Sequence, residues 1–322
     1  YGGLITRQDM ENYKIVWRQP IHIRVDSLDV YSMPPPSSGG IGVGQILTLL
    51  QPYDFDLLTP DSPEYIHLFA EAARLTFADR SAHLGDPDYY QVPEGLLDSA
   101  YLAERREQIR ERRASSSEDI HPGNPSAVES EQTTHFSVCD RQGNMVAVTT
   151  TINTAFGSKM VVGGAGFLLN NEMDDFAIKP GYPNVYGLIG FEANKIAPGK
   201  RMLSSMAPTV ILVRDTPFLI TGSPGGSRII TTVAQSILNF ARFELSLEET
   251  VSRPRFHHQW LPDVLYLEQG GFDVSVKQTL IRYGHTIEER QPFGNLEMIN
   301  IMPGGLMHGA SDPRGGGAVS GY

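Results

Sequence analysis

The spacing of apolar residues predicts mixed strands and helices in the first 95 residues. Residues 21–25 alternate between apolar and polar side chains, as a half-buried strand does, and a turn rich in proline and glycine leads into an apolar stretch at residues 41–50. The Ser-Pro-Glu run at residues 62–64 is typical of a helix N-terminus, because a hydroxyl caps free N–H groups, proline suits the first turn and an acid faces the helix dipole. We expect this helix to end near residues 85–87.

The next segment is polar and predicts a connection between two folded parts. Residues 101–113 are highly charged, and residues 114–132 contain few large apolar side chains. Such a stretch cannot bury enough apolar surface to fold by itself. The sequence therefore predicts a solvated linker over residues 114–132.

Period-two alternation resumes after the linker and predicts a β-hairpin. Residues 133–138 and residues 145–152 both have the pattern of a strand. An Asp-Arg-Gln-Gly turn at residues 140–143 connects them. The hairpin would therefore begin directly after the linker.

The second half of the chain contains further strand and helix patterns. We expect an apolar strand at residues 166–169 and a strand pair at residues 209–213 and 217–221. A glycine-rich turn then leads directly into residues 229–238, whose apolar residues have helical spacing. These patterns predict an α+β protein without internal repeats.

Composition narrows the class of protein. The chain has 322 residues, of which 40% are hydrophobic and 20% charged, so a sizeable core can form. Its 26 basic and 37 acidic side chains give a net charge of -11, which argues against a general binder of nucleic acid or anionic membranes. One cysteine excludes a disulfide within the chain and a zinc site built from cysteines. The chain starts with Tyr1, and we expect it to be processed or truncated there.

Gly225 and Gly226 lie in the turn between a predicted strand and a predicted helix. Backbone N–H groups and the helix dipole could face an anion there, although a tight turn that merely requires glycine is equally consistent. A phosphate loop is less favoured, because no lysine follows in the required pattern. An oxyanion hole fits better, since developing negative charge needs fixed donors.

Three polar motifs have both a structural and a functional interpretation. Residues 170–175 are polar and acidic, and form either a solvated turn or a site for an ammonium group or a cation. Ser204 and Ser205 are a hydroxyl pair for a carboxylate, or simply a turn. For His257 and His258, structural hydrogen bonding is favoured over metal binding, because adjacent residues point in different directions and no HExxH spacing accompanies them.

Thr133 is the candidate hydroxyl nucleophile. The chain has no Gly-x-Ser-x-Gly elbow, and Cys139 lies in the middle of the predicted hairpin without an obvious base. A threonine hydroxyl needs a base to take its proton, and an N-terminal threonine can use its own α-amine. That mechanism requires cleavage between Gln132 and Thr133, where a strand begins after the predicted linker. An ordinary first residue of a strand is the alternative, and composition does not decide between the two.

Seven motifs resemble those of the γ-glutamyltransferase (glutathione hydrolase) family. They follow the family order across nearly the whole chain, and Met202 is a small departure where the family usually has proline. The motifs are PPPSSGG at residues 34–40, TTHFSV at 133–138, TTTIN at 149–153, NNEMDDF at 170–176, PGKRMLSSM at 198–206, GSPGGSRIITT at 222–232 and PRFHHQWLPD at 254–263.

The resemblance implies an N-terminal-nucleophile hydrolase with an α+β fold, a four-layer αββα sandwich. It also implies that a proenzyme cuts itself before Thr133. Residues 1–132 would then be the C-terminal part of a large subunit, including the linker, and residues 133–322 a small catalytic subunit. No metal and no organic cofactor is implied.

The resemblance assigns a role to each motif residue. Thr133 would be the nucleophile, with its hydroxyl held by Thr151. Gly225 and Gly226 would form the oxyanion hole. The γ-glutamyl group would be bound by the remaining residues: its α-amino group by Asn153, Glu172 and Asp175, its α-carboxylate by Ser204 and Ser205, and its outer face by the lid residue Tyr186.

The implied activity is γ-glutamyl transfer from glutathione and other γ-glutamyl compounds to water, amino acids or peptides. The partners would be these substrates and the two subunits of one precursor, with no nucleic acid. By resemblance the protein would be periplasmic or secreted. The family's substrate-binding arginine lies upstream of residue 1, and Arg80 does not occupy the matching motif.

Two alternatives to this activity remain open. One is a glutaryl-type β-lactam acylase, which would not need the three ammonium-binding residues. The other is an inactive fragment or binding module that keeps the fold but lacks the upstream region.

Overall fold

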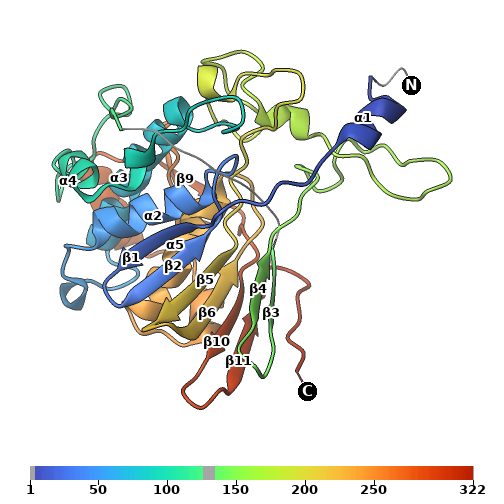
Figure 1. Cartoon of the computed structure of the whole chain (residues 1–322). Coiled ribbons are helices and arrows are strands. Elements are labelled where there is room, and N and C mark those ends of the chain that lie inside the picture. The colour runs from blue at the N-terminus through green and yellow to red at the C-terminus, as the bar shows by residue number, and fades with distance from the viewer. Residues whose placement is uncertain (1–3, 126–134, 322) are drawn as a thin grey trace.

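A six-stranded antiparallel sheet forms the centre of the computed structural model, which describes residues 4–125 and 135–321 (Figure 1). Its strand order is β1-β2-β5-β6-β10-β11. Hairpins connect β1 to β2, β5 to β6 and β10 to β11, so the sheet is built from three local pairs. The strands are β1 (Ile21–Val25), β2 (Leu28–Ser32), β5 (Thr209–Val213), β6 (Thr216–Gly222), β10 (Glu297–Ile301) and β11 (Met307–Ser311).

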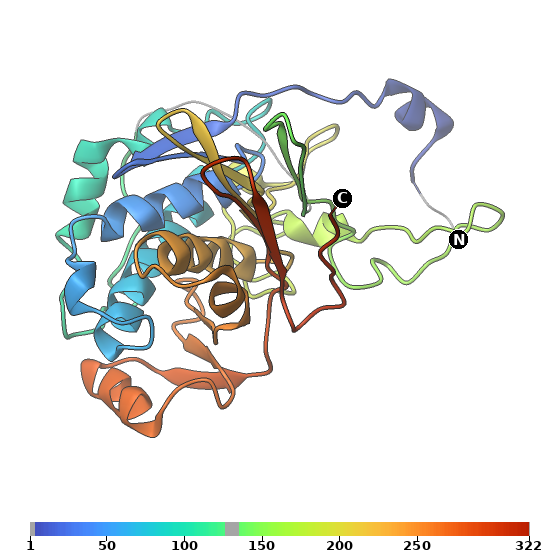
Figure 2. The same cartoon turned by 90° about the horizontal axis from the view of Figure 1, so that it is seen from below.

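Helices cover one face of this sheet, and a separate hairpin lies against the other face (Figure 2). The hairpin pairs β3 (Phe136–Cys139) with β4 (Met145–Val148). A small sheet of β7 (Phe256–His257), β8 (Leu265–Glu268) and β9 (Ile287–Arg290) lies beyond the helices. The helices are α1 (Arg7–Asn12), α2 (Gly39–Leu50), α3 (Pro63–His83), α4 (Ser99–Arg106), α5 (Arg228–Ala241), α6 (Leu247–Ser252) and α7 (Val274–Tyr283).

Most of the predicted elements are confirmed. The strand at residues 21–25, the strand pair β5–β6 and the helix α5 form where the apolar pattern places them. In α3 the Ser62 hydroxyl accepts the Tyr65 N–H at 3.3 Å, as expected of the cap. The predicted hairpin is also present, although its described strands are shorter than expected and Thr133 lies outside the described residues.

The predicted strand at residues 166–169 is wrong. This segment is a loop, with a single bridge between Val161 and Leu168. Gly166 has a φ of +75°, a left-handed conformation that interrupts an extended backbone. An apolar run of four residues is too short to distinguish a strand from a loop, and here Phe167 and Leu169 are exposed.

The prediction of a solvated linker is wrong for residues 114–125. Their backbone groups bind polar side chains of the folded body: Ser115 N–H donates to Glu71 at 3.1 Å, Ser117 N–H to Asp263 at 2.7 Å and Gly123 N–H to Asp79 at 2.9 Å. The Trp260 indole N–H donates to the carbonyls of Ser117 and Ile120, both at 3.0 Å. Such a segment needs few apolar residues of its own. The rest of the predicted linker lies outside the described residues.

Helix α3 carries an unusual number of buried polar side chains, and these hold the segment just described. Arg74 is 1% exposed and forms ion pairs with Glu71 and Asp263. His67 donates from Nε2 to the Arg110 carbonyl at 2.6 Å, so its Nδ1 accepts a hydrogen bond from His285 at 2.8 Å. His67, Glu71 and His285 lie close enough to surround a metal ion, but hydrogen bonds and the Arg74 ion pair already occupy the facing atoms.

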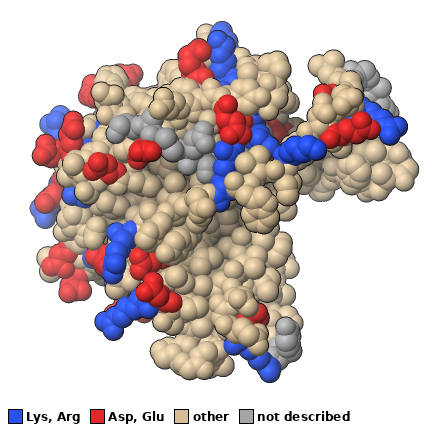
Figure 3. Space-filling view, in the orientation of Figure 1, with Lys and Arg blue, Asp and Glu red and all other residues tan. Residues whose placement is uncertain are grey.

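Charged side chains on the face shown in Figure 3 lie in mixed groups of both signs, and the surface over the strands is largely uncharged. This distribution agrees with the exclusion of a general nucleic-acid binder. None of the helices in residues 4–125 and 135–321 is both long and apolar enough to cross a membrane.

Replacing Arg74 by methionine should destabilise the fold strongly. The change leaves Glu71 buried without its cation, and a broken buried pair typically costs about 3 kcal/mol or more. We expect the melting temperature to fall by several degrees. Arg7→Met is the matched control, because Arg7 pairs with Glu11 on an exposed helix and its loss should leave melting almost unchanged. Equal melting of the two variants would contradict the proposed role of the α3 cluster.

Candidate functional site

A pocket of about 100 Å³ collects residues from five separate segments of the chain. It brings together eight of the predicted site residues, and Glu172 lies beside them in the same short turn as Asp175. Thr133 lies outside the described residues. The predicted residues in the lining are Thr151, Asn153, Asp175, Tyr186, Ser204, Ser205, Gly225 and Gly226.

The two glycines form the sharp connection between β6 and α5. Gly225 has a φ of +140° and Gly226 a φ of +59°, and a Cβ on Gly226 would lie 2.7 Å from the Tyr186 ring. Their carbonyls accept hydrogen bonds from Arg228 and Ile229, so the glycines lie directly before the first turn of α5. N–H groups at a helix N-terminus have no acceptor within the helix, and the dipole there favours negative charge. The loop can therefore stabilise an oxyanion.

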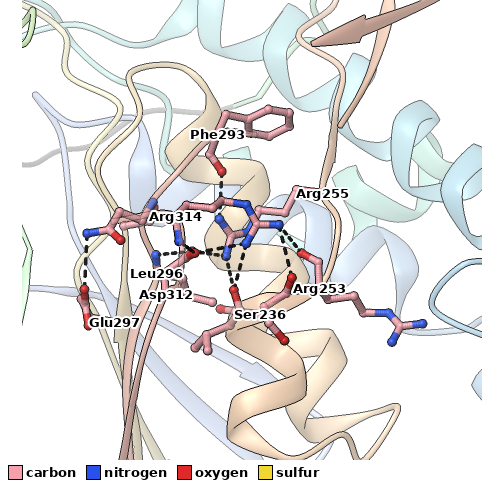
Figure 4. A network of polar contacts seen from close by, with 12 residues as sticks. Ser236, Arg253, Arg255, Phe293, Leu296, Glu297, Asp312 and Arg314 are labelled. Carbon is pink, nitrogen blue, oxygen red and sulfur yellow. Dashed lines mark hydrogen bonds and ion pairs between the residues drawn. The ribbon is translucent and has the colours of Figure 1, made fainter. Parts of the chain in front are cut away.

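A buried network of ion pairs centred on Asp312 is connected to this loop through residues 293–295 (Figure 4). Arg255 pairs with Asp312 and donates to the Phe293 carbonyl at 2.8 Å. The N–H of Asn295 donates to the Ser223 hydroxyl at 3.0 Å, just before the two glycines. Arg314 adds a second cation, pairing with both Asp312 and Glu268. The sequence reading did not single out this network.

Glu172, which is buried, and Asp175, which is half-buried, lie in one 3-10 turn, Glu172–Asp175. Burial and the neighbouring Glu172 charge raise the pKa of Asp175 to about 7, although Arg80 opposes the increase. Burial also raises the pKa of Glu172. Thr151 and the Asn153 N–H lie nearby and lower that pKa in part, but neither Glu172 oxygen accepts a well-formed hydrogen bond within the described residues. The pair is therefore suited to a cationic ligand.

Asn153 adds a further acceptor to the carboxyl pair. Its backbone has a φ of +72°, and its N–H donates to the Thr151 hydroxyl at 2.7 Å. The side-chain amide donates to the Asn171 carbonyl at 3.2 Å, while the amide oxygen is buried without a donor among the described residues. An ammonium group, which has only donors, matches this arrangement of acceptors.

Ser204 and Ser205 are buried in the lining, and hydrogen bonds from Arg80 and Ser38 hold them in place. Arg80 donates to the Ser205 hydroxyl at 3.1 Å and to the Ser38 hydroxyl at 2.9 Å. Ser38 in turn donates to the Ser204 carbonyl at 2.7 Å. The proline-rich motif at residues 34–40 therefore positions the serine pair.

Arg80 is a residue of the site that sequence reasoning set aside. It is 4% exposed, and burial lowers its pKa to about 10 while Asp175 opposes the decrease. A sequence signal did exist: Arg80 lies fourteen residues, about four helical turns, after Ile66 and so on the apolar face of α3. A charge on a buried face requires partners, and here those partners belong to the pocket.

The ring of Tyr186 packs against Gly226. Its hydroxyl donates to the Asn153 carbonyl at 2.8 Å, and burial raises its pKa to about 12. The ring therefore spans the pocket from Gly226 to Asn153.

The remaining candidates have structural roles. His257 hydrogen-bonds to Thr231 and Gln259, both at 2.8 Å, and His258 hydrogen-bonds to Asp263 at 3.2 Å, which confirms the structural interpretation. Burial and Asp140 raise the pKa of the Cys139 thiol, so it is not an activated nucleophile.

Comparison with known proteins identifies the family of the chain. The sequence model described as gamma-glutamyltranspeptidase matches residues 1–322. The chain is 48% identical over 314 residues to the glutathione hydrolase proenzyme of Escherichia coli (strain K12), covering 97% of this chain and 54% of that protein. The chain thus spans about half the length of the curated relatives that it matches.

Two solved structures show the same similarity. The Helicobacter pylori gamma-glutamyltranspeptidase T380A mutant is 52% identical with a TM-score of 0.56, covering 57% of this chain and 100% of that one. The cephalosporin acylase from Bacillus halodurans is 26% identical with a TM-score of 0.85, covering 100% of this chain and 56% of that one. The neighbours confirm the fold of an N-terminal-nucleophile hydrolase. This chain belongs to the gamma-glutamyltranspeptidase family.

Proposed function

We propose that the protein transfers γ-glutamyl groups from glutathione and related compounds to water, amino acids or peptides. The observation that carries the proposal is the shape of one pocket, where buried acceptors, a braced serine pair and the glycine loop face a common space. An α-amino acid head group has one ammonium and one carboxylate. The acceptors at Asn153, Glu172 and Asp175 would take the ammonium, and the hydroxyls of Ser204 and Ser205 the carboxylate.

The nucleophile in this proposal is Thr133, freed by self-cleavage after Gln132. Two described residues support its position. His135, two residues further on, packs its ring against Gly222 at the end of β6, and two extended residues span at most about 7 Å. Thr151 lines the pocket and would hold the Thr133 hydroxyl. Residues 1–132 would then belong to the large subunit and residues 133–322 to the small one.

The chemistry follows from these positions. The α-amine of Thr133 accepts the proton of its own hydroxyl, and the oxygen attacks the γ-carbonyl carbon of the substrate. The N–H groups of Gly225 and Gly226 stabilise the oxyanion. The C–N bond then breaks, and the leaving amine takes the proton from the Thr133 ammonium. Water or an acceptor amine resolves the resulting γ-glutamyl ester, with no step that needs a metal or organic cofactor.

A glutaryl-specific acylase is the second candidate, because the cephalosporin acylase of Bacillus halodurans shares the fold over the whole chain. A glutaryl group lacks the α-ammonium. It would supply no cation to Glu172 and Asp175 beyond Arg80, which already acts on Asp175, so the carboxyl pair favours the γ-glutamyl substrate. An inactive fragment is the third candidate, which the assay below would reveal. We also propose export to the periplasm or the outside of the cell, as expected from the family resemblance.

Thr133→Ala should abolish both cleavage of the chain and release of a chromogenic amine from a γ-glutamyl anilide. We expect activity to fall at least about 1,000-fold, because the variant has no oxygen to form the ester. Denatured mass should show an uncut chain in the variant and two fragments, separated before Thr133, in the unaltered protein. These assays use the whole gene product that contains the 322 residues.

Thr134→Ala is the matched control, since it removes the neighbouring threonine hydroxyl. It should keep cleavage and most of the activity. Equal rates for Thr133→Ala and the unaltered protein would eliminate Thr133 as the nucleophile, and an unaltered protein that neither cleaves nor releases amine would support the inactive fragment.

Substrate binding should weaken as the pH falls below about 7. Asp175 has a pKa of about 7, so protonation below that pH removes the charge that would pair with the substrate ammonium. We expect kcat/KM to fall almost tenfold for each pH unit well below 7. Asp175→Asn should raise KM and remove most of the fall in kcat/KM below pH 7, the acid limb of the pH profile. Asp119→Asn, an exposed change outside the pocket, should alter neither KM nor the pH profile. An unchanged acid limb in Asp175→Asn would contradict the assignment.

A pair of anilides that differ only in the α-amino group separates the two acyl specificities. We expect kcat/KM at pH 8 to be about 100-fold higher for the γ-glutamyl than for the glutaryl compound, because a charge-assisted contact to the ammonium is worth about 3 kcal/mol. Asp175→Asn should narrow this ratio. A faster reaction with the glutaryl compound would favour the acylase.

A further inference from the structure

Gln259 lies in the motif at residues 254–263, to which the proposed chemistry gives no role. It follows directly after β7 and His258, and it is 4% exposed. No contact to substrate is needed to explain its burial, because its side chain lies between the lid and the start of α5.

All four hydrogen-bonding positions of the Gln259 amide are in use. The oxygen accepts from the Ser227 hydroxyl and from His257 Nε2, both at 2.8 Å. The nitrogen donates to the carbonyls of Tyr186 at 3.0 Å and Leu261 at 3.3 Å. Because both nitrogen partners are carbonyls and Ser227 donates to the oxygen, the orientation of the amide is fixed by its partners.

Each of these contacts reaches an element of the pocket. Ser227 follows the glycine loop directly and is the N-terminal cap position of α5. His257 continues the link, since its Nδ1 hydrogen-bonds to Thr231 one turn into α5 at 2.8 Å. The Tyr186 carbonyl belongs to the lid. The Gln259 amide therefore joins the lid to the glycine loop at Gly225 and Gly226, called the oxyanion loop below.

The lid, residues 184–188, is also attached elsewhere: the Val185 N–H donates to Asp174 at 3.1 Å, and Leu188 is buried in the hydrophobic core. The Tyr186 hydroxyl donates to Asn153, while the N–H groups of Tyr186 and Leu188 both donate to Asn184 within the lid segment itself. Gly187 packs against the Gln259 nitrogen, from which an added Cβ would be 3.3 Å away. Without Gln259, the Tyr186 carbonyl would lose the hydrogen bond from the Gln259 nitrogen, while the Tyr186 hydroxyl, the Val185 N–H and the buried Leu188 would keep their contacts.

We propose that Gln259 is a positioning residue that latches the Tyr186 lid to the oxyanion loop. The latch rests on the proposed function, since it fixes the cover of the γ-glutamyl site relative to the groups that stabilise the oxyanion. Gln259 would act through Tyr186 and Ser227 and not by touching the substrate.

Two substitutions separate the hydrogen bond to the Tyr186 carbonyl from the hydrogen bonds with Ser227 and His257. Gln259→Glu keeps an acceptor for Ser227 and His257 but, as a carboxylate, has no donor for the Tyr186 carbonyl. We expect KM for the γ-glutamyl anilide to rise about tenfold at pH 8 with kcat changed less than about threefold, since about 1.4 kcal/mol corresponds to tenfold. Gln259→Met removes the hydrogen bonds to Ser227 and His257 as well as the one to the Tyr186 carbonyl, and it should also lower kcat.

A double variant tests whether the effect passes through the lid. In a Tyr186→Ala background, Gln259→Glu should no longer raise KM, because the ring that the latch positions is absent. A KM increase of the same size in both backgrounds would overturn the latch.

Hydrogen exchange gives a readout that does not depend on catalysis. In Gln259→Glu the amides of residues 185–188 should exchange at least about tenfold faster, while the β5–β6 amides keep their rates. Gln235→Met is the matched control, because Gln235 is an equally buried amide that joins α5 to β7 by donating to the carbonyls of Thr231 and Phe256. It should lower the melting temperature without changing KM or lid exchange.

The outcomes distinguish the latch from the proposed function. Unchanged lid exchange in both Gln259 variants, or equal changes in Gln235→Met, would overturn the latch. If the unaltered protein releases no γ-glutamyl anilide, the proposed function fails, while faster lid exchange in Gln259→Glu would still support the latch.

Discussion

The buried polar face of α3 is the constraint on which the rest of the site depends. An ionised side chain inside a protein is tolerated only when partners surround it, so each charge on this helix fixes the segment that supplies its partner. Arg74 and Asp79 hold the chain at residues 114–125, which leads toward the proposed cleavage position. Arg80, further along the same helix, braces the serine pair of the pocket. Cleavage, if it occurs before Thr133, would therefore leave the preceding segment attached.

Two carboxyls of the pocket, Glu172 and Asp175, lower the stability of the folded protein when both are charged. They lie in one turn and repel each other, and their raised pKa values indicate that the folded protein disfavours their charged forms. Stability from these groups is therefore greatest at low pH, where both are protonated, and declines as the pH rises through about 7. An ammonium ligand would offset this cost at neutral pH. The Arg255–Asp312–Arg314 network reaches the segment before the glycine loop through the Phe293 carbonyl and the Asn295 N–H, which donates to Ser223.

Much of the fold and the site could be predicted from sequence, for reasons that differ between residues. Amphipathic segments such as α5 and the β5–β6 pair follow from local periodicity. Gly226 could be proposed from its place between a predicted strand and a predicted helix, and its left-handed backbone and close packing explain why glycine is required there. The roles of Asn153 and Tyr186 came only from the family resemblance. Arg80, Gln259 and the order of residues 114–125 depend on contacts between segments far apart in the chain, as in the Arg80–Ser205 hydrogen bond. No pattern along a single segment records such contacts.

The central claim is that Thr133 carries the γ-glutamyl group during turnover, and trapping that ester tests it most directly. The whole gene product would be mixed with a γ-glutamyl anilide at pH 8, quenched in acid within the first turnover and digested for peptide mass mapping. The account predicts one γ-glutamyl adduct on the peptide that begins at Thr133, absent when the quench follows complete hydrolysis. An active protein whose adduct lies on another residue, or that turns over with no adduct on that peptide, would contradict it.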